Sequence, residues 1–258
     1  MSSVCMPSLF IGHGSPMNLV LENAFTHALQ ELSQKLPLPK AILVISAHWY
    51  TDATTISIAS GIASKTLYDF HGFPKVLYDI NYESPSNTTI AKRIATLLDA
   101  PMLERGLDHG AWMPLHFLFP KASVPVIELS INKNLPMPLH VKIGEQLQVL
   151  RKEGIMIVGS GNITHNLKRI DAYAIDAPVA PWAQNVDNFI SNAFTCNDIE
   201  SLVNIQTLCP EFETAHPSLE HYMPLLYIAG SRLPNEEAKI LTPFFQNSSL
   251  SMKGFMFS

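Results

Sequence analysis

The sequence predicts an α/β fold, a single-domain sandwich over residues 1–258 with a mostly parallel central sheet flanked by helices. Two observations predict it. Short apolar runs, rich in β-branched residues, end in Gly, Ser, Pro or Asn, which is typical of strands buried on both faces. Segments with apolar residues at helical spacing lie between these runs, and such alternation favours a parallel sheet covered by helices. The 258 residues contain no repeat, linker or low-complexity segment that would mark a second domain.

Four apolar runs are expected to form the buried strands, at residues 8–12, 41–46, 125–131 and 154–161. The run at 54–60 differs, because apolar and polar residues alternate along it. Alternation indicates a strand with one solvated face. We therefore expect this fifth strand as an antiparallel addition to the sheet.

Helical spacing of apolar residues predicts helices at 18–36, 89–98 and 140–152, the last capped by Gly154 just past its end. A fourth helix is expected to begin near Pro217, since proline is favoured at the first helical position. Glu220 would then lie in the first turn, where the helix dipole favours a negative charge.

Composition excludes several classes of function. Net charge is −5 and no Lys/Arg run occurs, which argues against nucleic acid and anionic membranes as partners. The amino terminus lacks the pattern of a signal peptide, and no apolar stretch reaches the roughly 18 residues that cross a bilayer. The cysteines Cys5, Cys196 and Cys209 have no disulfide-framework or metal-binding spacing. We expect a cytoplasmic protein; the sequence carries no signal for an oligomeric state.

Histidines follow three of the predicted strands. His13, His48 and His165 each come just after an apolar run. Ligands of open α/β sheets bind beyond the carboxyl ends of the strands, so these imidazoles are expected to gather at one edge. Each histidine taken singly is equally well explained as a hydrogen-bonded structural residue. Their common placement favours a metal site.

Further ligand candidates lie in the segment HPSLEHYMPLLY, which contains His216, Glu220 and His221. Either an imidazole or a carboxylate suits a catalytic metal, so this pattern leaves the choice between them open. Adjacent residues of a helix point about 100° apart, so Glu220 and His221 are not expected to bind one metal together.

Other histidines divide into candidates for catalysis and structural residues. His109, in LDHGAW, precedes an apolar and aromatic stretch and is a candidate acid or base. His71 and His116 are weaker candidates. His27 and His140 lie in predicted helices and are interpreted as surface or packing residues. The sequence has no G-x-S-x-G nucleophile elbow and no Walker-type phosphate loop.

Several long motifs resemble one known family. The strings LFIGHGSPM, ILVISAHWY, FHGFPKVLYDINY, LDHGAW, GIMIVGSGNITHNL and EHYMPLLY occur in this order from about residue 7 to residue 230. Together they are similar to the DODA-type extradiol aromatic ring-opening dioxygenases of the class III, LigB-like group. The resemblance implies an enzyme that opens the ring of a catechol, such as DOPA, with dioxygen.

The resemblance also implies roles for five histidines. His13, His48 and His221 match the motifs that supply metal ligands. His165 matches a histidine that acts as a fourth ligand or as the acid/base. His109 matches a histidine of the family that either supports the metal ligands from behind or is itself catalytic. One divalent metal ion, Zn²⁺ or Fe²⁺, is implied. The histidine at position 221 departs from the wider class III pattern, in which a glutamate is usual.

Two alternatives stay open beside the dioxygenase. One is a zinc hydrolase that uses the same histidines. The other is a metal-binding or ligand-binding protein without catalysis. For a catechol substrate, the sequence offers aromatic residues that can wall a pocket and basic residues that can meet a carboxylate. The aromatic candidates are Trp49, Phe70, Trp112 and Tyr222, and the basic candidates are Lys75, Arg105 and Lys168.

Overall fold

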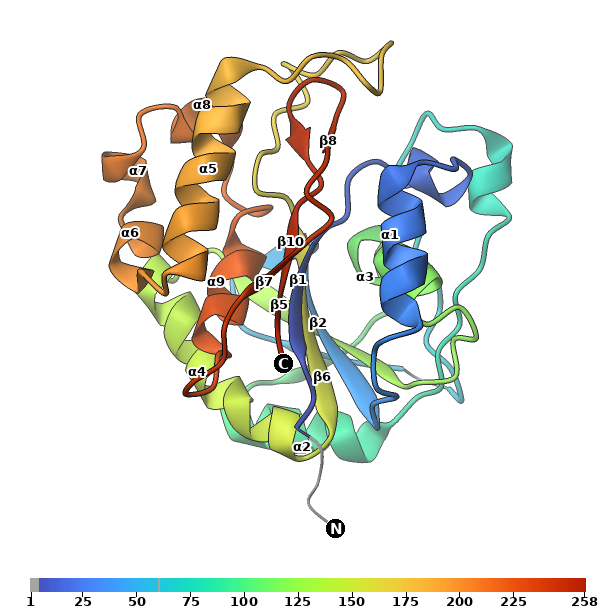
Figure 1. Ribbon diagram of the computed structural model, residues 1–258. Coiled ribbons are helices and arrows are strands. Elements are labelled where there is room, and N and C mark those ends of the chain that lie inside the picture. Colours follow the sequence, from blue (N-terminus) through green and yellow to red (C-terminus); the bar gives the residue numbers. More distant parts are fainter. Residues whose placement is uncertain (1–4, 60) are drawn as a thin grey trace.

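The computed structural model describes residues 5–59 and 61–258, and four parallel strands form the centre of its main sheet. These are β1 (Ser8–Gly12), β2 (Ala41–Thr51), β5 (Val126–Asn132) and β6 (Ile155–Gly161). Their side chains are buried almost throughout, as expected for strands covered on both faces. The predicted strands and the mostly parallel sheet are confirmed (Figure 1).

Shorter strands extend this sheet at both edges. Within the described residues the strand order is β4-β3-β5-β2-β6-β1-β10-β7. β3 pairs antiparallel with β5, which confirms the antiparallel addition predicted for 54–60, although Ser60 lies outside the described residues. β10 and β7 run antiparallel at the opposite edge, and two further strands form a separate pair. The bounds are β3 Ile56–Ile58, β4 Met102–Glu104, β7 Lys239–Leu241, β8 Phe245–Gln246, β9 Leu250–Ser251 and β10 Gly254–Phe257.

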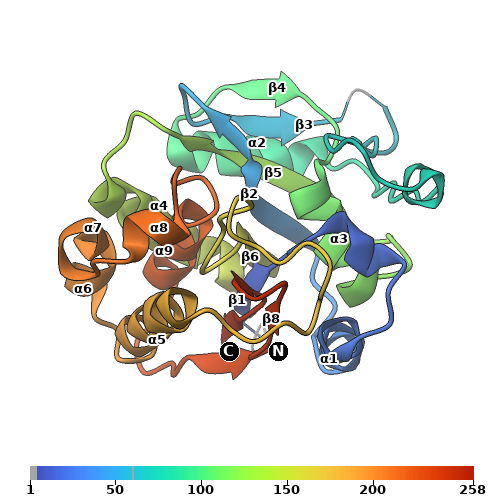
Figure 2. The same cartoon turned by 90° about the horizontal axis from the view of Figure 1, so that it is seen from above.

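Helices cover the two faces of the sheet unequally. α1 and α3 pack on one face, whereas α2, α4, α5 and α9 contribute to the core on the other (Figure 2). Short helices connect α5 to α9. The bounds are η1 Pro16–Leu19, α1 Ala24–Ser33, η2 Lys75–Tyr78, α2 Thr88–Leu98, α3 His109–Leu118, α4 Met137–Lys152, α5 Pro181–Thr195, α6 Ile199–Val203, α7 Ile205–Leu208, α8 Phe212–Ala215 and α9 Met223–Gly230.

The helix predicted at 18–36 is wrong in its extent. The chain forms η1, breaks, and resumes as α1. Asn18 is buried and its amide exchanges hydrogen bonds with Gln246, while Asn23 is extended and caps α1 by accepting from the Thr26 amide. Asparagine side chains that hydrogen-bond to nearby backbone compete with helical hydrogen bonds and break the helix here. The helical spacing of apolar residues continues across this break and does not reveal it.

The helix predicted to begin near Pro217 is also wrong, because α9 begins at Met223 with Pro224 in its first turn. The His221 backbone is held against the sheet: its carbonyl accepts from the Asn162 amide at 3.0 Å. A Cβ at Gly161 would lie 2.1 Å from that carbonyl, so only glycine allows the approach. This contact with β6 keeps the segment before Met223 out of the helix. Glu220 and His221 are therefore not helical neighbours.

Two further sequence predictions concern the whole chain. Cys5, Cys196 and Cys209 are free. Within the residues described, helices long and apolar enough to cross a membrane are absent.

Candidate metal centre and pocket

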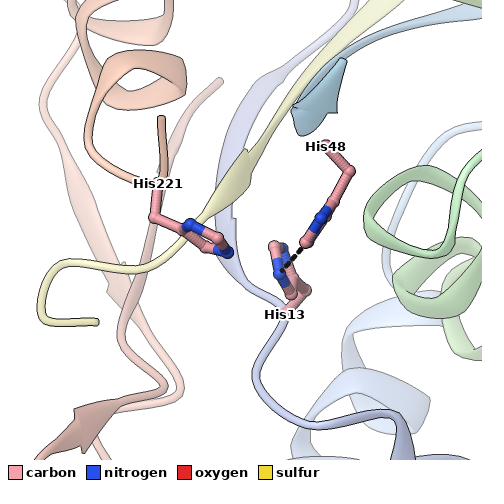
Figure 3. Close-up of side chains that lie close together, drawn as sticks. All are labelled: His13, His48 and His221. Carbon is pink, nitrogen blue, oxygen red and sulfur yellow. Dashed lines mark hydrogen bonds between the residues drawn. The ribbon is translucent and has the colours of Figure 1, made fainter. Parts of the chain in front are cut away.

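Three histidines converge at the carboxyl ends of the central strands. His13 follows β1, His48 lies in β2, and His221 precedes α9 (Figure 3). The Nε2 atoms of His13 and His48 are 3.1 Å apart, and one nitrogen from each of the three rings lies within 4.8 Å of the others. His48 was expected just beyond its strand. It lies inside β2 instead, because β2 pairs with β5 again after a register shift between Ile45 and Tyr50.

The three imidazoles are neutral. Burial, followed by the neighbouring imidazoles, lowers the pKa of His13 and of His221 well below its ordinary value. Burial and His109 lower the pKa of His48 to about 3, against the opposing charge of Asp69. A neutral imidazole is the form that binds metals.

His221 presents an unpartnered nitrogen to this centre. Its Nδ1–H donates to Glu220 Oε1 at 3.2 Å, so Nε2 carries no proton. Nε2 is buried and has no hydrogen-bond partner among the described residues, an arrangement that is costly unless something binds there. Three neutral nitrogens facing one point fit a divalent cation with Zn–N or Fe–N bonds of about 2.0–2.1 Å.

A proline in α3 fixes the tautomer of His13. Pro114 lacks an N–H, so the carbonyl of Gly110, four residues earlier, has no helical donor. The Ser160 hydroxyl donates to that carbonyl at 2.5 Å, and it must therefore accept from His13 Nδ1 at 2.9 Å. His13 thus carries its proton on Nδ1, which leaves Nε2 free as a ligand atom.

His48 rests on a buried ionic network that the sequence did not reveal. The Ser46 hydroxyl accepts from the His48 amide and donates to Asp108 Oδ1 at 2.6 Å. Arg105 donates to Asp108 at 3.2 Å and to Glu128 at 2.9 Å. Burial, and for Glu128 also the adjacent Asp108, raises the pKa of both carboxyls against the pull of Arg105. Asp108 also caps α3, whose first residue is His109.

His109 is held by an aspartate that the sequence analysis also missed. Asp69 Oδ1 accepts from both His109 Nδ1 and the His109 amide, each at 2.9 Å. Its other oxygen lies 3.8 Å from His48 Nδ1. Since the carboxylate can only accept, Nδ1 of His109 carries a proton, and in the neutral ring Nε2 is the nitrogen free to accept one. Asp69 stands directly before the FHGFP motif, and that adjacency was the one available signal.

His165 lies beside the three converging histidines rather than among them. Its ring stacks on that of His221, with centroids 3.5 Å apart and planes within 7°. It shares a cluster of close ligand atoms with Glu220 and His221. Burial, the first cause, lowers the pKa of His165 to about 4, while the charge of Glu220 opposes the shift.

The remaining histidines serve the structure or the surface. His216 is buried and donates from Nε2 to the Ile163 carbonyl at 2.7 Å, so it is turned away from the centre. His140 is buried and bonded to the Tyr227 hydroxyl, which fits its interpretation as a packing residue. His27 and His71 are exposed.

A pocket of about 790 Å³ opens above the histidines. His13, His48, His109, His165 and His221 all line it, together with a largely apolar wall. Of the four aromatic residues offered by the sequence, only Phe70 lines it, and Phe73 joins it. The other three belong elsewhere: Trp112 and Tyr222 are core residues, and Trp49 lies under the Arg105 guanidinium.

Comparison with known proteins shows which family the chain is similar to. Residues 8–258 match the family described as the catalytic LigB subunit of aromatic ring-opening dioxygenase. A 4,5-DOPA dioxygenase extradiol from Escherichia coli is 39% identical over 98% of this chain and 94% of its own length. One from Beta vulgaris is 34% identical over 97% and 96%. The crystal structure of an uncharacterized protein from Escherichia coli K12 superposes with a TM-score of 0.85 at 34% identity, covering 98% of this chain and all of that one.

The chain therefore belongs to the LigB family of aromatic ring-opening dioxygenases. This confirms the resemblance drawn from the motifs and the prediction of a metal-dependent extradiol ring-cleaving enzyme.

Proposed function

We propose that the enzyme opens the ring of a catechol, with DOPA as the first candidate, and that His13, His48 and His221 hold one Fe²⁺ for this reaction. The observation that carries the proposal is the trio of neutral imidazoles at the base of a largely apolar pocket, with the buried Nε2 of His221 unpartnered among the described residues. Bound Fe²⁺ would supply open coordination positions and, unlike Zn²⁺, redox chemistry toward dioxygen.

Two more histidines of the pocket supply proton transfer in this proposal. His109 accepts a catechol hydroxyl proton at Nε2, because Asp69 holds the proton of its other nitrogen. His165, stacked on His221 and partly exposed to the pocket, is the second acid/base and delivers a proton during ring opening. Asp69 acts through His109 as a positioning residue. The names of the relatives specify DOPA and cleavage of its 4,5 bond, and we carry both to this chain as part of the proposal.

A zinc hydrolase is the second candidate, because a three-histidine site with an open position also suits catalytic Zn²⁺. The two differ in metal and in the need for dioxygen.

Anaerobic reconstitution separates these candidates. The apoprotein is loaded with Fe²⁺ or with Zn²⁺, mixed with DOPA and simpler catechols, and then exposed to air while oxygen uptake and the yellow absorbance of a ring-opened semialdehyde are followed. We expect uptake and colour with Fe²⁺ only. Protein that holds one Fe²⁺ per chain and consumes no oxygen with any catechol would contradict the proposal.

A further inference from the structure

One wall of the pocket carries three carboxamide side chains that are hydrogen-bonded to one another, here called the amide cluster. They belong to Asn18 in η1, Asn23 before α1 and Gln246 in β8, and all three residues line the pocket. Asn18 is 1% exposed and Gln246 is 5% exposed. β8 stands at the end of the molecule where the parallel strands finish (Figure 1). The cluster therefore adds buried polar groups to a largely apolar wall.

A backbone donor at the start of α1 fixes the orientation of each carboxamide. The Thr26 N–H can only donate, and it donates to Asn23 Oδ1 at 3.1 Å. Asn23 therefore turns its Nδ2 toward Asn18 and donates to Asn18 Oδ1 at 2.9 Å. Asn18 then donates from its own Nδ2 to Gln246 Oε1 at 3.1 Å, and Gln246 Nε2 donates back to Asn18 Oδ1 at 3.0 Å. The orientation of all three carboxamides follows from this one donor.

The amide cluster has hydrogen-bond donors to spare. A carboxamide nitrogen has two N–H bonds. Each of the three nitrogens finds one acceptor among the described residues, so one N–H on each is left for a ligand or for water. The oxygens of Asn23 and Gln246 each keep a lone pair, but an oxygen with one partner is satisfied, whereas every buried N–H needs its own acceptor. The wall therefore favours a ligand group that accepts hydrogen bonds.

The cluster adjoins the loop that carries His13. Gly14, the residue after His13, has a φ of 65°, and a Cβ built there would lie 3.2 Å from Asn18 Nδ2. The Asn18 carboxamide thus lies against the backbone next to a proposed metal ligand. A substituent on a ring bound at the histidines can reach the amide cluster.

Neutral donors are what the described pocket wall offers to a substrate carboxylate, because lysine and arginine are absent from that wall. Lys75 and Lys168, two basic candidates from the sequence, lie outside it. The third, Arg105, is engaged by Asp108 and Glu128. An N–H that donates to a carboxylate forms a stronger hydrogen bond than one between neutral groups.

We propose that the amide cluster selects catechols whose side chain carries a carboxylate, the class to which DOPA belongs. This inference rests on the proposed function and names the residues that recognise its substrate. The spare N–H bonds of Asn18 and Gln246 donate to the carboxylate oxygens, and Asn23 holds the other two carboxamides in place. A hydrogen bond to a charged group commonly corresponds to a roughly 10- to 100-fold change in affinity.

Two exposed acids on the same wall affect the choice of test. Glu22 and Asp176 are the charged residues other than histidine that line the described pocket. They attract an ammonium group and oppose a carboxylate, and solvent screens both effects because the two side chains are exposed. A test therefore needs substrates that differ in the carboxylate alone.

Two matched pairs of catechols meet this condition. DOPA and dopamine share an ammonium group and differ in the carboxylate, whereas 3,4-dihydroxyphenylpropionate and 4-ethylcatechol differ in the carboxylate and lack the ammonium. We expect kcat/KM of the Fe²⁺-loaded enzyme to be roughly 10- to 100-fold higher for the carboxylate member of each pair. The preference should persist in about 0.5 M NaCl, because the donors carry no net charge. Equal values within either pair, or a preference that salt abolishes, would overturn the inference.

Variants assign the preference to the amide cluster. Gln246→Met keeps the length of the side chain and removes its donors, so it should reduce the preference within both pairs at least roughly threefold. Gln246→Glu replaces the donor by a charged acceptor and should reduce the preference further. Gln30→Met makes the same substitution at an exposed position of α1 outside the pocket, and it should leave the preference as in the wild type. The full wild-type preference in both Gln246 variants would overturn the assignment, and the comparison of substrates on the wild-type enzyme does not depend on how these variants fold.

Binding keeps this inference distinct from the proposed reaction. Anaerobic titration of the Fe²⁺-loaded protein with the same four catechols gives their affinities without turnover. Tighter binding of the carboxylate member of each pair, in protein that opens no ring in air, would support the selection and contradict the dioxygenase reaction. Ring opening of all four catechols with equal affinities and equal kcat/KM would support the reaction and overturn the selection.

Discussion

At the scale of single residues, the proposed metal site depends on which nitrogen of each imidazole carries the proton. His13 presents Nε2 because Ser160 takes its Nδ1–H, and Ser160 does so because Pro114 leaves the Gly110 carbonyl without a helical donor. Groups that orient metal ligands in this way commonly contribute 10- to 100-fold to metal affinity. Pro114 of α3 thereby prepares His13, the proposed ligand that follows β1.

Ser160→Ala tests this chain of hydrogen bonds. The variant should bind Zn²⁺ or Fe²⁺ roughly 10- to 100-fold more weakly, because His13 loses the acceptor that fixes its tautomer. Competition with a chromophoric chelator measures the affinity. Ser160→Thr retains the hydroxyl and serves as control; an alanine variant with unchanged affinity would show that the hydroxyl does not prepare the ligand.

The two proposed roles of His165 are separated by metal content. His165→Ala should abolish turnover and leave the metal content largely intact, because its ring stacks beside His221 and lies outside the trio. His221→Ala, the matched variant, should lose the metal. Both variants are equilibrated with the same concentration of metal, and elemental analysis then gives their metal content. Loss of metal from His165→Ala would show that His165 is a ligand.

Asp69 should act on turnover through His109, to which it is hydrogen-bonded, rather than through His48, from which it lies 3.8 Å away. Asp69→Asn is expected to lower kcat roughly 10- to 100-fold with metal content retained, since it weakens the control of the His109 tautomer. In a His109→Ala background the same change should have almost no further effect. Additive losses in this double-mutant cycle would instead assign Asp69 a separate structural role.

At the scale of elements, α9 positions His221 because it packs very closely on α4. A Cβ at Gly144 would lie 2.1 Å from the Tyr227 carbonyl, and one at Gly230 would lie 2.0 Å from the Val141 carbonyl. Glycine at both positions lets the two backbones approach each other. The start of α9, where His221 emerges, is fixed by this contact and by that of His221 with β6.

Gly144→Ala should therefore destabilise the protein. Forcing the helices apart is expected to cost about 1–3 kcal/mol of unfolding free energy, with some loss of metal affinity as His221 moves. Urea unfolding of the apoprotein measures the first effect. Gly61→Ala is the control, because a Cβ there meets nothing within 4 Å. Equal stability of the two variants would mean that the helices adapt without strain.

Elements also show where local sequence signals failed. Continuous apolar runs identified the central strands because both faces of the sheet are covered. The helical spacing of apolar residues continued from η1 into α1, so it did not predict the break between them. Pro217 resembled a helix start, yet the contact of His221 with Gly161, sixty residues away, determines the backbone there. The strands β7 to β10 span two to four residues each, too few for a periodic pattern.

The site divides in the same way. The convergence of His13 and His48 was predictable because strand ends of an α/β sheet share one edge. His221 was one of three candidates in its segment, and the motif resemblance favoured it over His216 and Glu220. The sequence did not indicate the roles of Ser160, Asp69 and the network around Arg105. Each acts through a side-chain contact between segments that are distant in sequence. Ser160 and His13, for example, are 147 residues apart. No spacing rule records such a contact.

At the scale of the whole molecule, neutral buried histidines make stability depend on pH. Burial, the largest cause, lowers the pKa of His216 to about 4 in the folded protein, against 6.5 for the ordinary side chain. Below about pH 6.5, His216 binds a proton in the unfolded chain but stays neutral in the folded protein. The free energy of unfolding therefore falls as the pH drops from about 6.5 toward 4. The loss is on the order of 3 kcal/mol once both states are protonated.

Urea unfolding of the apoprotein at pH 7 and pH 5 measures this dependence. His216→Asn should lose less stability between these two values than the wild type does, although it is less stable at pH 7. A wild-type midpoint that is the same at both values would contradict neutral burial of this histidine.

The central claim is that the trio His13, His48 and His221 supports insertion of dioxygen into a catechol ring. Its most direct test is a single turnover of the Fe²⁺-loaded protein with a catechol under ¹⁸O₂, followed by mass spectrometry of the product. The account predicts a ring-opened product that contains the substrate plus both atoms of one dioxygen molecule, with any loss of label confined to exchange of its aldehyde oxygen with water. A product whose new oxygen comes only from water, or recovery of unchanged catechol, would contradict it.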